Sequence, residues 1–239
     1  AWHQPVGTWS DDTGMALATC DSLRELGRVD VADMRDKFIR WRDSQDYNVD
    51  RRFDIGGATA SALASGHGLA GERDNGNGSL MRIVPLAFTD AGDDEIRSVS
   101  AITRAHPISC EACVTYVRYA RLLRDGVSPL EALHDKRVAY GLSGVASRTT
   151  AGVGVDDLTI IPKLNRKDVA SSGFVIDTLA AAIWCLTTTM RYADCVLEAV
   201  NLGEDTDTTA AVAGGLAGIV YGMGAIPDEW LHLLRGKDV

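Results

Sequence analysis

The stretch NLGEDTDTTAAVAGGLAG, residues 201–218, brings acidic residues and hydroxyls directly before an uncharged run rich in alanine and glycine. Asp205, Asp207 and Thr208 fall where the pattern predicts the start of a buried helix over 206–222. One interpretation is a helix cap, formed by Asp or Thr, with a second acid present by chance. A second interpretation is a metal site, because hard oxygen ligands of this kind suit Mg²⁺ or Mn²⁺ rather than zinc.

The stretch GTWSDDTGMALA, residues 7–18, repeats this pattern at the other end of the chain. Ser10, Asp11 and Asp12 precede a predicted helix that ends at Gly27. Each cluster alone favours the capping interpretation. Together they supply four carboxylates and two hydroxyls, which a two-metal oxygen site with ions about 3.5–4 Å apart needs. Spacing alone does not show that the two helix starts meet.

The remaining chain predicts an all-α fold, because apolar residues recur at helical spacing in most of its segments. Strand signals are almost absent: LTII at 158–161 is short and is interrupted by Pro162. The glycine-rich tracts 56–78 and 141–154 predict surface loops, and no linker divides residues 1–239. Further helices are expected over 35–43, 96–103, 108–125, 174–191 and 196–200.

Composition is that of an ordinary globular protein, with 46% hydrophobic and 24% charged residues. A net charge of −9 without a basic patch argues against a nucleic-acid partner. Five cysteines do not suggest a disulfide framework, so we expect a reducing, cytoplasmic location, and no secretory signal opens the sequence. The uncharged stretch 210–226, with Gly214, Gly218 and Gly222 in a row, favours a closely packed core helix over a membrane span.

A third motif, RDNGNGSLMR at residues 73–82, has glycines that let a backbone approach a ligand and amides that could cradle phosphate. Asn-Gly-Asn-Gly is also good turn chemistry, so this signal is weak. Cys110 and Cys113 form a CxxC motif, but no matching pair completes a zinc site, which favours packing.

In this order the three motifs resemble the ADP-ribosylglycohydrolase family, including its dinitrogenase reductase-activating branch. The resemblance also covers DIGGAT, RAHP and SSGFVIDTLAAAIW, and so runs over nearly the whole chain. It implies a single-domain orthogonal bundle of helices with a dinuclear Mg²⁺ or Mn²⁺ centre. It further implies an enzyme that hydrolyses the glycosidic bond between ADP-ribose and a modified protein side chain, most often arginine.

Residue by residue, the resemblance implies three sets of roles. The metal ligands would be Ser10, Asp11, Asp12, Asp205, Asp207 and Thr208, and the catalytic acids Asp74, Asp12 and Asp207. The substrate would be held by Asn77, Gly78, Ser79, His106, Gly173, Phe174 and Val175, with Phe174 stacking on adenine.

Simpler interpretations of several residues stay open. His106 could be an ordinary histidine at a helix terminus, Asp74 could form a solvated ion pair with Arg73, and Phe174 could be a core residue. The family normally opens with a buried helix bearing Gly-Asp-Ala-(Leu/Ile)-Gly, which this sequence lacks, and its loss would expose an apolar groove. Two other functions remain: an immunity-type protein that binds an ADP-ribosylating toxin, and a hydrolase of a small ADP-ribose conjugate.

Overall fold

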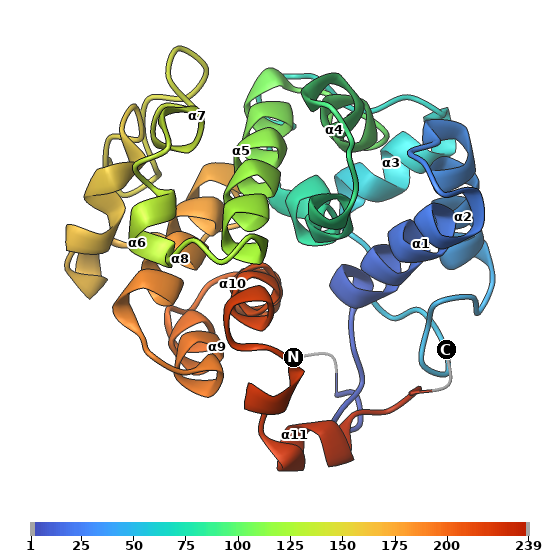
Figure 1. Cartoon of the computed structure of the whole chain (residues 1–239). Helices are drawn as coiled ribbons and strands as arrows, with labels where there is room; N and C mark the ends of the chain where they lie inside the picture. The colour runs from blue at the N-terminus through green and yellow to red at the C-terminus, as the bar shows by residue number, and fades with distance from the viewer. Residues whose placement is uncertain (1–2, 238–239) are drawn as a thin grey trace.

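Helices make up almost all of the regular structure in this computed structural model, which describes residues 3–237 (Figure 1). Within that range there is no strand, only three isolated bridge pairs, so the all-α prediction is confirmed. The α-helices are α1 (Asp11–Leu26), α2 (Val31–Asp43), α3 (Gly57–Ser65), α4 (Asp93–Ser100), α5 (Pro107–Arg124), α6 (Pro129–Ala132), α7 (Lys136–Ala139), α8 (Val175–Thr188), α9 (Tyr192–Asn201), α10 (Thr206–Tyr221) and α11 (Asp228–Leu233). Short 3₁₀ helices are η1 (Asn77–Arg82), η2 (Val84–Phe88), η3 (Leu158–Lys163), η4 (Arg166–Asp168) and η5 (Met223–Ala225).

Helix α1 ends at Gly27, as the sequence predicts, whereas α2 begins four residues before the predicted 35–43 stretch. Gly27 terminates α1 in the left-handed conformation at φ 65°, and its amide donates to the Leu23 carbonyl. Asp30 then caps α2 by accepting from the amides of Ala32 and Asp33. Phe38 and Trp41 of α2 are fully buried, as the 35–43 pattern predicts.

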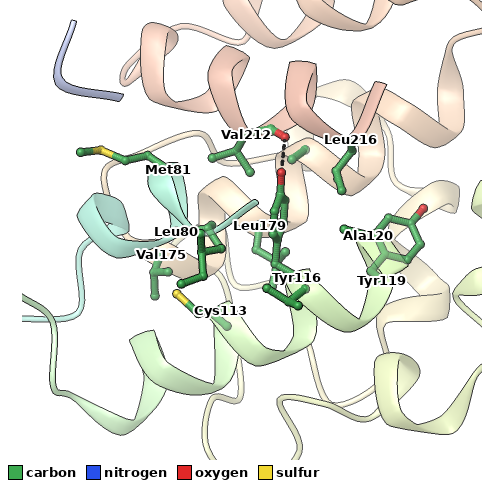
Figure 2. Packing of buried hydrophobic residues seen from close by; sticks show 14 of the residues in the cluster. Leu80, Met81, Cys113, Tyr116, Tyr119, Ala120, Val175, Leu179, Val212 and Leu216 are labelled. Atoms are coloured by element: carbon green, nitrogen blue, oxygen red, sulfur yellow. Dashed lines mark hydrogen bonds between the residues drawn. The ribbon is translucent and has the colours of Figure 1, made fainter. Parts of the chain in front are cut away.

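Helices α5, α8 and α10 form the centre of the molecule, with α1–α4 on one side and α6 and α7 on the other (Figure 1). The buried cluster runs from Met15 in α1 to Ala217 in α10, so the chain has one core and forms a single domain. Figure 2 shows Tyr116 of α5 pointing to α10, where its hydroxyl donates to the Val212 carbonyl at 3.0 Å. This bond satisfies a buried hydroxyl and fixes α10 against α5.

Two local predictions differ from the structure in part. The 158–161 segment, whose weak strand signal Pro162 interrupts, is the 3₁₀ helix η3. The tract 56–78 is not all loop: α3 forms at its start, where Thr59, Ala62 and Leu63 are buried. The close approach expected along Gly214, Gly218 and Gly222 occurs at Gly214, where an added Cβ would lie 3.4 Å from Val196, whereas nothing lies within 4 Å of the other two.

Other expectations fit the structure. No helix in the 3–237 range is long and apolar enough to cross a membrane. Cys110 and Cys113 are buried free thiols, as the packing interpretation predicts.

An open, largely apolar groove of about 800 Å³ lies between α1 and η2, lined by residues that include Leu23, Val84 and Phe88.

Candidate active site

The N-termini of α1 and α10 lie together, so the two acidic clusters at opposite ends of the sequence form one site. Ser10 and Asp205 occupy the N-cap positions, yet neither side chain accepts a capping hydrogen bond from a backbone amide of its own helix. Instead, the Ser10 hydroxyl donates to the Asp12 carboxylate at 2.7 Å. Backbone capping therefore does not account for these polar side chains, although the carboxylates of Asp11, Asp12 and Asp207 in the first turns suit the helix dipoles.

The carboxyls of this site are crowded and partly withdrawn from water. Burial, reinforced by the Asp11 carboxylate, raises the pKa of Asp12 to about 8. Burial, with Asp54 and Asp207 adding repulsion, raises the pKa of Asp11 to about 6. The pKa of Asp205 is also raised, mainly by burial. Such a group of carboxyls is unfavourable by itself and needs protons or cations to balance its charge.

Asn77, at the start of η1, connects this cluster to α8. Its side-chain amide donates to the Asp205 carboxylate at 2.8 Å and to the Thr178 hydroxyl at 2.9 Å. Both amide hydrogens are therefore used inside the protein. The backbone amide of Asn77 donates to the Gly173 carbonyl at 3.0 Å, which joins the 73–82 motif to the residues before α8.

Two cavities meet at Asp207. The smaller, of about 160 Å³, is lined by Asp11, Asp54, Gly56, Thr59, Asn77, Gly78, Met81, Arg104, Asp205, Asp207 and Thr208. The larger, of about 610 Å³, is more open, and its lining includes Ser10, Asp12 and Asp207 together with Trp9 and Phe53. The carboxylates thus stand between two spaces that a bound molecule could occupy on either side of a scissile bond.

Asp54 is a residue of this site that the sequence interpretation missed. It lines the smaller cavity and lies near enough to Asp11 to raise the pKa of that carboxyl. Its only sequence signal is its position at the head of the DIGGAT motif, which precedes α3. Arg104, of the RAHP motif, was likewise not assigned a role and also lines this cavity.

Several residues expected to hold substrate have side chains directed elsewhere. Ser79 is fully buried and accepts a hydrogen bond from the Ser100 hydroxyl. Val175 is fully buried in the core. Phe174 is partly buried, packs against the same core and precedes α8, which agrees with its simpler interpretation.

Asp74, Gly173 and His106 lie outside the linings of both cavities. Asp74 accepts a hydrogen bond from the Gly71 amide at 2.9 Å, and no ion pair with Arg73 is found among residues 3–237. Gly173 is exposed, and a Cβ there would lie 3.4 Å from the Asp205 carboxylate. His106 caps α5, its Nδ1 accepting from the Ile108 amide, so it is a helix-terminal histidine at an N-terminus.

The donor set suits hard divalent cations. The described side chains do not include three or more Asp, Glu, His or Cys gathered tightly enough to form a ready-made metal site. The Asp12 Oδ1 atom is buried without a hydrogen-bond partner, and the surrounding donors are carboxylate and hydroxyl oxygens. A buried oxygen left unpaired next to other carboxylates fits a cation that draws the two helix starts together.

Comparison with known proteins agrees with this architecture. The family model described as ADP-ribosylglycohydrolase matches residues 1–239. The chain is 32% identical to ADP-ribosylarginine hydrolase Tri1 of Pseudomonas putida, covering 95% of this chain and 62% of that protein. It is 30% identical to ADP-ribosyl-[dinitrogen reductase] glycohydrolase of Rhodospirillum rubrum, covering 97% of this chain and 75% of that protein.

A solved structure titled ADP-ribosylglycohydrolase-related protein complex superposes with a TM-score of 0.71 at 29% identity, over 96% of this chain and 77% of that one. The chain spans less than two thirds of the length of the Tri1 proteins that it matches. The match over all 239 residues and the shared fold give one conclusion: the chain belongs to the ADP-ribosylglycohydrolase family.

Proposed function

We propose that this protein hydrolyses the N-glycosidic bond between ADP-ribose and an arginine side chain of a modified protein, and so reverses mono-ADP-ribosylation. The observation that carries the proposal is the convergence of the α1 and α10 acidic clusters on two adjoining cavities. The choice of arginine rests on the similarity to ADP-ribosylarginine hydrolase Tri1 of Pseudomonas putida. We place the activity in a reducing cytoplasm, in keeping with five free thiols.

We propose that the site holds two divalent cations, Mg²⁺ or Mn²⁺. Ser10, Asp11 and Asp12 would bind them from α1, and Asp205, Asp207 and Thr208 from α10, with Asp54 as an additional oxygen donor. When bound, such cations supply positive charge that orients ribose hydroxyls and makes a nearby water more acidic.

The protein's own carboxylates would carry the proton transfers. Water oxygen forms a bond to the anomeric carbon while the bond from that carbon to the guanidine nitrogen breaks. One proton of the water passes to a carboxylate and from there to the leaving nitrogen, so ADP-ribose and unmodified arginine are released. Asp12 and Asp207 line the cavities and are suitably placed for this step, whereas Asp74 lies outside them.

Carboxylates would also stabilise the positive charge that develops on the ribose ring as the bond breaks. Asp11 and Asp207 face the cavity from opposite helix starts, so the ring would lie between negative groups. Asn77 keeps Asp205 oriented through its 2.8 Å hydrogen bond, and we propose this positioning role for Asn77 in place of direct ribose binding.

The test is release of ADP-ribose from a protein ADP-ribosylated on arginine, with Mg²⁺ or Mn²⁺ supplied and with chelator as the blank. Wild type should release ADP-ribose, and Asp12→Asn and Asp207→Asn should lower the rate by about 10²-fold or more. Release of ADP-ribose is also measured from a serine-linked protein substrate and from small ADP-ribosyl conjugates. Absence of release from the arginine-linked substrate at saturating metal would refute the proposal.

A further inference from the structure

Arg104 is a buried cation that the fold leaves incompletely paired. Its side chain is 7% exposed, and its Nε and Nη1 atoms are buried without a hydrogen-bond partner. Among the described residues it is the one arginine with two such nitrogens. Leaving two donors of a charged group unpaired is unfavourable, and it sets Arg104 apart from arginines whose guanidinium groups bind neighbouring elements.

The Arg104 guanidinium packs beside three glycines of two motifs, Gly56, Gly76 and Gly78. Its Nη2 atom lies 3.0 Å from where a Cβ would stand at Gly78, 3.5 Å from that position at Gly76 and 3.9 Å from that at Gly56. A side chain at Gly78 would press against both Arg104 and the Thr59 hydroxyl, which lies 3.1 Å from the same point. These glycines, which the sequence suggested would let a backbone approach phosphate, thus also make room for a cation at the cavity wall.

Arg104 is also the one Lys, Arg or His among the described residues lining the 160 Å³ cavity, which otherwise carries the carboxylates of Asp11, Asp54, Asp205 and Asp207. Burial lowers the pKa of Arg104 from its ordinary value, while Asp74 on its other side opposes this shift. A guanidinium keeps its charge even when partly buried. Among the charged side chains that line this cavity, Arg104 is therefore the one that attracts an anion, whereas the four carboxylates repel it.

Arg82 provides a contrast within the same core. It is fully buried, stacks over Phe38 with its guanidinium carbon 4.6 Å from the ring centre, and donates to the carbonyls of Gly78 and Val99 and to the Thr103 hydroxyl. Its Nη1 and Nη2 atoms bind neighbouring elements and its Nε alone is left without a partner, as expected for an arginine that holds a fold together. Arg104 makes no comparable set of bonds.

We propose that Arg104 binds the diphosphate of the ADP-ribosyl substrate, donating from Nη2 to a phosphate oxygen at the edge of the acidic cavity. This inference rests on the proposed function for the identity of the anion. It makes Arg104 a specificity-determining residue, because ligands that carry a diphosphate are bound more tightly than neutral ribosides without one. The negative charge of Asp74 favours the charged form of this guanidinium.

Direct binding experiments test this separately from catalysis. Binding of ADP-ribose and of adenosine, which lacks phosphate, is measured by calorimetry on Mg²⁺-loaded wild type, Arg104→Met, Arg104→Lys and Arg82→Met. Arg104→Met should weaken ADP-ribose binding about 10–100-fold, the effect of losing a charge-assisted hydrogen bond, and leave adenosine binding within about twofold. The ADP-ribose affinity of Arg104→Lys should lie between those of wild type and Arg104→Met, because lysine keeps the charge without the planar guanidinium. The ADP-ribose affinity of wild type should also drop with added NaCl more steeply than that of Arg104→Met.

Thermal unfolding distinguishes a ligand-binding arginine from a structural one. Arg104→Met should melt at or above the wild-type temperature, because it removes a buried, poorly paired charge. Arg82→Met should melt about 5–10 °C lower, because it breaks a satisfied buried network. Unchanged ADP-ribose affinity in Arg104→Met, or an equal loss for adenosine, would overturn the inference. Arginine-dependent ADP-ribose binding without hydrolysis would instead refute the proposed function and leave this inference standing.

Discussion

Asn77 and Asp205, 128 residues apart in sequence, are joined by a 2.8 Å hydrogen bond from the Asn77 amide to the Asp205 carboxylate. The same amide donates to Thr178, so η1, α8 and the start of α10 meet at one side chain. Asn77 is buried, and this link fixes a carboxylate that we propose as a metal ligand. A partner that orients a ligand in this way usually affects metal affinity nearly as much as the ligand does.

Asn77→Ala is therefore expected to weaken Mn²⁺ binding and to lower the rate of ADP-ribose release, each by about 10–100-fold. It should also reduce the free energy of unfolding by about 1–3 kcal/mol, because Thr178 and Asp205 lose a buried donor. Calorimetric Mn²⁺ titration and urea unfolding measure the two effects. Asn75→Ala is the control, since Asn75 donates only to the nearby Glu72 carbonyl. Equal metal affinity in Asn77→Ala and wild type would contradict the positioning role.

Without metal, the stability of the protein should depend on pH through Asp11 and Asp12. Burial raises their pKa values from the ordinary 3.8 to about 6 for Asp11 and about 8 for Asp12. At a pH between 3.8 and 8 the folded chain therefore holds more protons on these carboxyls than the unfolded chain does. This contribution to stability is complete below pH 3.8 and is lost as pH rises through 6 and 8.

The comparison that isolates this effect is wild type against Asp12→Asn, unfolded in urea with chelator present. As the pH rises from about 5 to 8, the free energy of unfolding of the variant should increase relative to that of wild type by roughly 1–3 kcal/mol. Mn²⁺ at about 100 times its Kd should restore about 2.7 kcal/mol to wild type at pH 8, and less to the variant. A difference between the two proteins that does not change with pH would show that Asp12 is not held as described.

Asp54→Asn should weaken Mn²⁺ binding about 10–100-fold, because it removes one carboxylate from the lining of the smaller cavity. Electron paramagnetic resonance of free Mn²⁺ gives the affinity directly. Asp50→Asn is a matched control from the same loop, because the Asp50 carboxylate pairs with Arg235 away from the cavity. If both substitutions have the same small effect, Asp54 is not a metal donor.

The helices were largely predictable because their ends carry local signals. Gly27 adopts a left-handed conformation, Asp30 forms a side-chain cap, and Pro107 opens α5. Such signals depend on a few neighbouring residues and so can be seen in the sequence. The convergence of α1 and α10 depends on the packing of η1 against both helices, and the spacing of residues in the sequence does not predict such long-range packing.

The site was predictable in part for the same reason. Acidic residues at helix starts are visible in a sequence, whereas Asp54 precedes α3 in a segment with no periodic pattern. The use of a side chain is harder to predict than its location: the Asn77 amide binds protein groups. Val175 was expected to contact nucleotide, but the first turn of α8 directs it into the core.

Asp177, a fully buried carboxylate in the first turn of α8, holds the loop after α7 to the residues that precede α8. It accepts hydrogen bonds from the Thr150 amide at 2.8 Å, from the Thr150 hydroxyl, and from the Ser172 hydroxyl at 2.5 Å. Asp177→Asn keeps the shape of the side chain but replaces one acceptor oxygen with an NH₂ that faces a donor, so it should cost about 2–4 kcal/mol of unfolding free energy.

Limited proteolysis of Asp177→Asn should then cut the 147–154 loop faster than in wild type. The KM for arginine-linked substrate should rise more than kcat falls, because the loop is joined to the residues before α8 rather than to the carboxylate cluster. Asp156→Asn, at an exposed position of the following segment, should change neither the cleavage rate nor KM. Unaltered proteolysis in Asp177→Asn would mean that this loop is held by contacts other than its hydrogen bonds to Asp177.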